Sequence, residues 1–201
     1  MQLKNSQVDR RIRRTKRNLK KAAINLMKIK EYNSITVKDI VASADYNRAT
    51  FYRHYQDKED LKDQLVDELL DKLINAFRYP YKNSKFVNAY SLTPSNVRIF
   101  DYIKDNADFY MLWKDSEGIP GFQGKFIQTL TELFNQDIVH LSNQQGDIDN
   151  ELFITYRTYG VWGLIINWIK SDFKTPSQDM AKQLINIINY HPLKIYETKH
   201  F

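Results

Sequence analysis

The sequence predicts an all-α fold of about nine helices, with a small N-terminal head of three helices and a larger helical body. Three observations support this fold class. Apolar residues recur at three- and four-residue spacing through most of the chain, good helix-capping residues precede several of these segments, and no strand-like alternation persists beyond a few residues. We expect residues 1–56 to form the head and residues 57–201 to form the body.

The formal net charge of +6 on the 201-residue chain is concentrated at one end. Residues 1–62 hold 16 Lys and Arg against 7 Asp and Glu, whereas residues 63–201 hold 14 against 17. A basic end on a nearly neutral body is typical of a protein that binds nucleic acid through that end. The chain has no cysteine, no apolar leader and no apolar run long enough to span a membrane, so we expect a cytoplasmic protein without disulfides.

A long first helix is expected from Asp9, as its cap, to about Lys30, with residues 1–8 frayed. Its apolar stripe comprises Ile12, Leu19, Ala22, Ala23, Leu26 and Met27. Its first turns carry a basic run made of Arg10, Arg11, Arg13, Arg14, Lys16 and Arg17. This run lacks the interleaved Trp, Phe or Leu of a helix that lies on a membrane. The basic run is either a solvated charged face or a surface that binds phosphate, and the segment that follows it in the chain favours phosphate binding.

Residues 35–61 predict two short helices joined by a tight turn. Thr36 can cap the first, with Asp39 in the reciprocal capping position, and its buried face is Val37, Ile40, Val41 and Ala44. Residues 45–47 interrupt this period, and Asn47 can cap a second helix from Arg48 to Tyr55. Phe51 and Tyr55 point inward, and Asp57 with Asp60 starts a third, longer helix. Two short helices of this kind fit the major groove of DNA.

The residues ATFYRHY at 49–55, followed by DKEDL at 57–61, resemble the recognition-helix signature of the TetR family of bacterial regulators. The sequence departs from that pattern in the turn. Asp45 replaces the usual glycine, Tyr46 a small apolar residue and Asn47 a serine. Aspartate tolerates the left-handed backbone that such a turn can need, so the fold is compatible with the change. The alternative is an ordinary three-helix core segment.

This resemblance implies a homodimer that binds a pseudo-palindromic operator in double-stranded DNA. Arg48 and Thr50 are expected at base edges, because guanidinium pairs with guanine and the threonine methyl group can touch thymine. Tyr52, His54 and Lys58 are expected at phosphates. The full expected set is Thr36, Lys38, Asn47, Arg48, Thr50, Tyr52, His54 and Lys58. A metal role for His54 is disfavoured, since no other ligand lies at a suitable spacing.

The body is expected to contain a connector helix at 58–77, an irregular linker or lid at 79–91, and a series of further helices. One helix is expected to begin at Thr93-Pro94, and two more are expected at 107–113 and 122–141. A break at 105–106, a turn at 116–121 and a loop at 143–147 interrupt the helical pattern. The penultimate helix is expected at 149–171, and because it is apolar nearly all round we expect it to be buried on both sides. The last helix is expected to follow a capping box at 175–178.

Residues 159–181 are similar to the C-terminal helices of a TetR subgroup common in low-GC Gram-positive bacteria. In the family the last two helices pair across a two-fold axis, which implies the same dimer here. The resemblance also implies an effector pocket, for which an aromatic lining would suit a small apolar or aromatic compound. The candidate residues are Tyr102, Tyr110, Trp113, Phe126, Tyr156 and Trp162. Ordinary core packing is the alternative, and Tyr156, Arg157 and Asn167 are candidates for buried polar groups.

The hypothesis is therefore a dimeric repressor that a small molecule releases from its operator. The alternative is a DNA-bound adaptor or activator whose body binds a protein partner. An enzyme is disfavoured, because the sequence has no nucleophile elbow, phosphate-binding glycine loop, metal-ligand spacing or pocket-like carboxylate pair. No cofactor, metal or membrane partner is expected.

Overall fold

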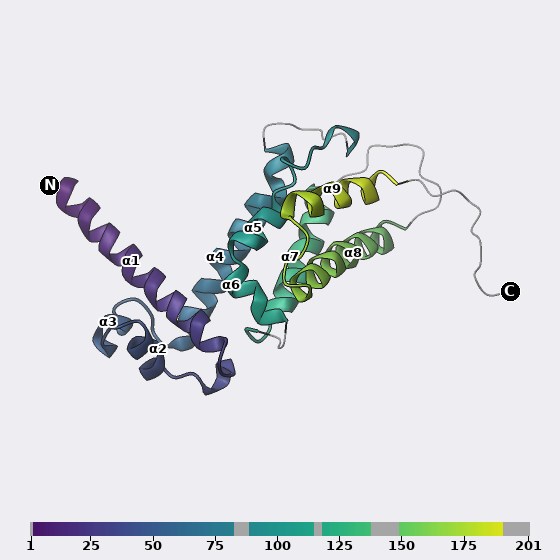
Figure 1. Cartoon of the computed structure of the whole chain (residues 1–201). Helices are drawn as coiled ribbons and strands as arrows, with labels where there is room; N and C mark the ends of the chain where they lie inside the picture. The colour runs from purple at the N-terminus through teal and green to yellow at the C-terminus, as the bar shows by residue number, and fades with distance from the viewer. Residues whose placement is uncertain (1, 83–88, 115–117, 138–148, 191–201) are drawn as a thin grey trace.

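The computed structural model describes residues 2–82, 89–114, 118–137 and 149–190 (Figure 1). These residues form nine α-helices and contain no strand, which confirms the all-α prediction. The α-helices are α1 (Gln2–Met27), α2 (Val37–Ser43), α3 (Arg48–Tyr52), α4 (Lys58–Arg78), α5 (Ile99–Asp105), α6 (Ala107–Tyr110), α7 (Phe122–Asp137), α8 (Asn150–Lys170) and α9 (Ser177–Ile188). The predicted loop at 143–147, the end of the helix near 141 and part of the turn at 116–121 lie outside the described residues.

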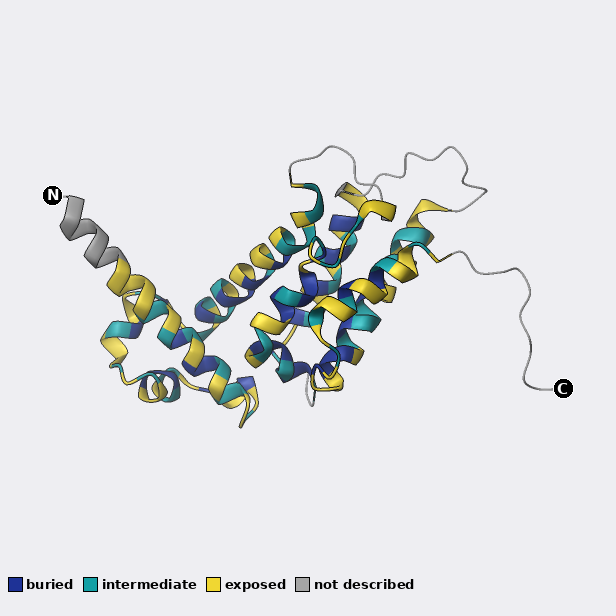
Figure 2. Cartoon of the chain, turned by 45° about the horizontal axis from the view of Figure 1, so that its top comes forward, coloured by how far each residue is buried: buried dark blue, intermediate teal, exposed yellow. Residues whose placement is uncertain are grey.

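Buried side chains gather in two clusters (Figure 2). The first joins α1, α2 and α3 around Leu19, Ile40 and Phe51, and the second fills the body between α4 and α9. Helix α4 belongs to both, because its Leu61 lies in the first cluster and its Leu73 lies in the second. In Figure 1 it runs from the small helices into the body. A movement of α4 therefore changes the packing of both parts.

Helix α1 begins seven residues before the predicted start at Asp9 and ends three residues before the predicted end at Lys30. The early start has a simple reason: residues 2–9 contain neither glycine nor proline, so nothing stops the helix there. At the other end, Lys30 N donates to Leu26 O and the chain turns. The N-terminal turns of α1 extend beyond α2 and α3 (Figure 1).

The predicted helix starts at Thr93-Pro94 and at the 175–178 capping box are both wrong. A local side-chain hydrogen bond explains the first, and a hydrogen bond to a distant helix explains the second. Thr93 donates to Asn96 Oδ1 through its backbone N–H and its hydroxyl, so the chain forms a turn and α5 begins only at Ile99. Thr175 does not cap α9, whose first turn has no side-chain cap of its own. Instead Ser177 donates its hydroxyl to Asp101 of α5, which thereby fixes the start of α9.

Candidate nucleic-acid interface

The start of α2 is held by the predicted capping box. Thr36 Oγ1 accepts from Asp39 N at 3.2 Å, and the Asp39 carboxylate accepts from Thr36 N at 2.8 Å. Lys30 lies 2.9 Å from the same carboxylate. The Lys30 ammonium and the Thr36 donors hold the pKa of Asp39 well below its usual range. Thr36 and Lys38 are exposed at this helix start, where a phosphate could reach them.

The turn between α2 and α3 has the predicted left-handed residue, since Asp45 has φ +56°. Asn47 caps α3 as predicted, its side-chain oxygen accepting from Thr50 N at 2.8 Å and from Thr50 Oγ1 at 2.9 Å. Tyr46 is partly buried against the head core, and its hydroxyl accepts from Asn18 Nδ2 of α1 at 3.2 Å. The large side chain that replaces a small apolar one therefore ties the turn to α1.

Helix α3 has an inward and an outward side. It ends at Tyr52, earlier than the predicted Tyr55, but Tyr55 N still donates to Phe51 O and the helical direction continues for one turn. Phe51 and Tyr55 are buried in the head core as predicted. Arg48 and Tyr52 are exposed, Tyr52 at 57%, and so is Arg53. Arg53 is a further exposed cation in this segment that the sequence-based prediction did not include.

His54 is half-buried beside cationic neighbours. Burial first, and then the charges of Lys16 and Arg53, lower the pKa of its imidazole. The ring is therefore neutral at pH 7, and it can donate one hydrogen bond to a phosphate without adding a charge.

Lys58 does not point freely toward solvent. Its ammonium donates to the carbonyl oxygens of Tyr32 at 3.3 Å, Asn33 at 3.1 Å and Ile35 at 3.0 Å, and lies 4.8 Å from the centre of the Tyr32 ring. Tyr32 in turn donates its hydroxyl to Lys58 O. The first turn of α4 is thus clamped to the loop that leads into α2.

In the body, five of the six predicted pocket residues lie together. Rings pack mostly edge to face, with centroids 5.2 Å apart for Tyr110 and Trp113, 5.3 Å for Trp113 and Phe126, and 5.1 Å for Trp113 and Trp162. Tyr102 joins them through Tyr110 at 6.1 Å. Such contacts are those of a filled core.

Tyr156 does not join this cluster, because it is 75% exposed on α8. The prediction that Tyr156 and Asn167 are buried polar groups is wrong, and one side of α8 is exposed in the single chain. The reason is that both residues lie on the side of α8 that turns away from α7. Arg157 is partly buried, with its guanidinium 5.1 Å from the Phe134 ring centre.

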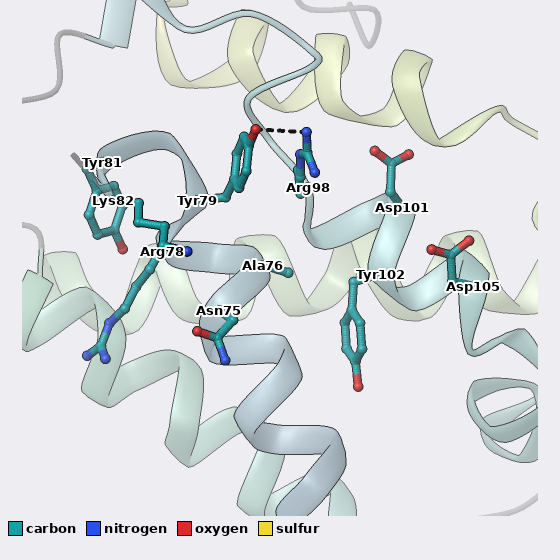
Figure 3. Close-up of a pocket in the computed structure, with 10 residues that line it drawn as sticks. All are labelled: Asn75, Ala76, Arg78, Tyr79, Tyr81, Lys82, Arg98, Asp101, Tyr102 and Asp105. Atoms are coloured by element: carbon teal, nitrogen blue, oxygen red, sulfur yellow. Dashed lines mark hydrogen bonds between the residues drawn. The ribbon is translucent and has the colours of Figure 1, made fainter. Parts of the chain in front are cut away.

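A surface pocket of about 970 Å³ lies between the end of α4 and α5 (Figure 3). It is lined by Asn75, Ala76, Arg78, Tyr79, Tyr81, Lys82, Arg98, Asp101, Tyr102 and Asp105. Arg98 stacks 3.6 Å from the Tyr79 ring centre and donates to its hydroxyl. Of the predicted pocket residues only Tyr102 takes part, with burial raising its pKa to about 12. Among the described residues there is no cluster of potential metal ligands and no helix suited to crossing a bilayer.

Known proteins match both parts of the chain. Residues 19–68 match the family model described as bacterial regulatory proteins of the tetR family, and residues 90–190, half of the chain, match the one described as a transcriptional regulator C-terminal region. The chain belongs to the TetR family of transcriptional regulators. The two matches together cover the α2–α3 unit and most of the body.

One curated relative of this TetR-family regulator is the uncharacterized HTH-type transcriptional regulator YxbF of Bacillus subtilis (strain 168), 25% identical over 197 residues. The match covers 96% of this chain but 49% of that protein, so the chain spans about half the length of the relative.

Solved structures confirm the fold of the TetR-family chain. A TetR regulator from Streptococcus agalactiae 2603V aligns with a TM-score of 0.58 and 24% identity, covering 92% of this chain and 98% of that one. A TetR-family regulator from Syntrophomonas wolfei aligns with a TM-score of 0.67 and 15% identity, covering 88% and 94%. The dihydroxyacetone kinase operon activator DhaS aligns with a TM-score of 0.58 and 21% identity, covering 87% and 94%.

Proposed function

We propose that this regulator is a cytoplasmic homodimer that binds a pseudo-palindromic operator and represses transcription until a small molecule binds its body. In this proposal residues 1–56 are the DNA-binding head and residues 57–201 are the effector-binding and dimerisation body. The observation that carries the proposal is the α2–α3 unit, whose two capped helices and left-handed turn fix an outward side bearing Arg48 and Tyr52.

Each exposed group has a proposed role in DNA binding. Arg48 pairs with a base edge in the major groove, and Thr50 contributes its methyl group, because its hydroxyl is already bound to Asn47. Asn47 acts indirectly, through its cap of α3. The other expected residues contact phosphates and set the register of the protein on the DNA, namely Thr36, Lys38, Tyr52 and His54. We add the exposed Arg53 to this group.

Lys58 is proposed to position the head and not to bind phosphate. Replacing it with methionine keeps the aliphatic stem and removes the ammonium that holds three carbonyl oxygens. We expect a lower melting temperature of the head and an unchanged salt dependence of DNA binding, measured by calorimetry and fluorescence anisotropy. A phosphate contact would instead reduce the slope of log K against log salt by about 1 per protomer, and that result would reject the clamp.

The dimer is proposed to form through α8 and α9. In the single chain, one side of α8 and the end of α9 expose large apolar and aromatic side chains, namely Leu152, Tyr156, Tyr159, Ile187, Ile188 and Tyr190. Gly160 and Gly163 lie on the same side of α8, and a Cβ atom at either would meet nothing within 4 Å. Exposed large apolar side chains in this number on the last two helices are unusual for a monomer and are suited to a two-fold partner.

The effector is proposed to enter the pocket between α4 and α5. Its lining carries both charges, so a small polar molecule with a flat portion fits better than a purely apolar one. Tyr102 connects the pocket to the aromatic cluster, and its hydroxyl donates to Leu69 O of α4. Asp101 connects the pocket to α9 through Ser177 and Gln178. A ligand there could thus shift α4 and the dimer helix together.

One observation favours the alternative of an activator or adaptor. The aromatic cluster is packed by ring contacts, which leaves the predicted apolar effector little room. One structural neighbour, DhaS, is named an operon activator. In this alternative the body binds a protein partner, and the DNA contacts remain the same.

The proposed function is tested by titrating the protein onto the DNA upstream of its own gene, beside an Arg48→Ala variant and a Lys174→Ala variant with the same charge change on the body. We expect Arg48→Ala to reduce specific affinity by about 30-fold or more while affinity for mixed-sequence DNA changes much less, because each of the two bidentate base contacts of the proposed dimer contributes roughly 1–3 kcal/mol. Lys174→Ala should behave as wild type. Equal binding by all three proteins would reject α3 as the recognition helix.

A further inference from the structure

The exposed arginines in the N-terminal half of α1 form a surface that the α2–α3 unit does not account for. We propose that Arg10, Arg11, Arg14 and Arg17, which we call the basic arm, bind the DNA phosphate backbone on the flank of the site contacted by α3. The inference rests on the proposed function and adds a second DNA-contacting element to it.

The charges on α1 divide into two groups. Lys16 and Lys20 are committed to the connector, since Lys16 Nζ donates to Gln64 Oε1 at 3.0 Å and Lys20 lies 2.7 Å from Glu68. The four arginines of the basic arm are exposed, and none of them forms an ion pair with a described carboxylate. The basic arm is therefore available to an external anion, whereas the neighbouring lysines stabilise the fold.

The helix geometry places the basic arm beside the start of α3. Asn18 of α1 is hydrogen-bonded to Tyr46, which lies in the turn just before α3. Arg14 and Arg11 precede Asn18 by four and seven residues, so they lie on the same row of the helix surface. At 1.5 Å per residue, Arg11 is about 10 Å further along the helix axis, which corresponds to at most about three base pairs of DNA.

The basic arm is also electrostatically strained without a partner. Arg10 and Arg14, like Arg14 and Arg17, are like charges at spacings where each pair destabilises a helix by about 0.2–0.5 kcal/mol. Asp9 is the one acidic residue in the sequence of α1, and it is three or four residues away from none of the four arginines. Packing helps little, because Ile12 is 39% exposed and Leu19 is the first buried residue between positions 10 and 27. Phosphates along the arm would remove the repulsion, so DNA should stabilise this part of α1.

A polyanion with regularly spaced charges is the occupant that these observations favour. The basic arm presents one sign of charge and no interleaved Trp, Phe or Leu, and its one interleaved apolar residue is Ile12, which disfavours a membrane surface. Phosphate contacts carry no sequence information, so the arm should strengthen binding to any duplex and widen the protected region around an operator.

The test compares the wild-type dimer with an arm variant, Arg10→Gln, Arg11→Gln and Arg14→Gln, which keeps good helix formers at all three positions. The matched control carries the same charge change on exposed body residues outside α8 and α9: Lys104→Gln, Lys125→Gln and Lys174→Gln. Binding is measured by anisotropy on two 40-base-pair duplexes, one taken from the upstream DNA and one of mixed sequence, over a range of salt concentrations.

We expect the slope of log K against log salt to fall by up to about 5 in the arm variant on both duplexes, since each lost phosphate contact contributes about 0.9 and the dimer has two arms. Hydroxyl-radical protection should shrink at its flanks and persist at its centre. A slope equal to that of the control variant, with unchanged flanks, would overturn the inference. Because the mixed-sequence duplex reports on the arm by itself, a failure of sequence-specific binding would reject the proposed function separately.

Discussion

Replacing Gly160 with leucine is expected to convert the proposed dimer to a monomer and to weaken operator binding by about 100-fold or more. The side chain at this position would point away from the rest of its own chain, because a Cβ atom there meets nothing within 4 Å. The substitution should even stabilise the isolated helix by up to about 1 kcal/mol, since glycine is a poor helix former. In a dimer packed through this surface of α8 the same side chain prevents close approach of the partner helix. A monomer has a single DNA-binding head, so it loses the additional operator affinity that two linked heads provide.

Light scattering after gel filtration measures the mass, and operator titration measures the affinity. Gly124→Leu on α7 is the matched control, because Gly124 is also helical, exposed and free of neighbours within 4 Å. We expect it to remain dimeric. A Gly160→Leu protein that keeps the dimer mass, or a Gly124→Leu protein that loses it, would contradict the assignment of the dimer to α8 and α9.

Replacing Phe51 with alanine is expected to unfold the head while the body stays folded. Phe51 is fully buried in the smaller core, and truncating such a ring removes about 3–5 kcal/mol. That loss is a large share of the stability of a unit this small. The body has its own core, so its unfolding transition should be retained. Calorimetry, with amide exchange to locate the protected segments, measures both transitions.

Tyr52→Ala serves as the neighbouring control, since Tyr52 is next in the chain but exposed. It should leave both unfolding transitions within about 0.5 kcal/mol of wild type and reduce DNA affinity. If Phe51→Ala instead abolishes both transitions together, the head and the body are a single cooperative unit and the proposed division at residue 56 is wrong.

The sequence was sufficient for the two caps of the α2–α3 unit, which are bonds between near neighbours in the chain. Thr36 and Asn47 cap their helices as predicted, because each bonds a backbone N–H only three residues away. The same locality explains Asp45, whose left-handed conformation is dictated by the turn itself. These local signals were enough to place the α2–α3 unit and its outward side.

Predictions failed where a distant residue takes over a local role. Asp101, far from α9 in the sequence, replaces the local cap that residues 175–178 were expected to supply. The exposure of Tyr156 has the same origin, because an apolar helix surface looks alike in sequence whether its own chain or a second chain covers it.

The most direct test of the account is a hydroxyl-radical footprint of the purified dimer on the DNA upstream of its own gene. We expect two protected segments of related sequence, arranged about a pseudo-two-fold axis and centred about one or more helical turns apart. The Arg48→Ala, Tyr52→Ala variant should lose this pattern. Uniform weak protection that is the same for both proteins would contradict sequence-specific binding through α3.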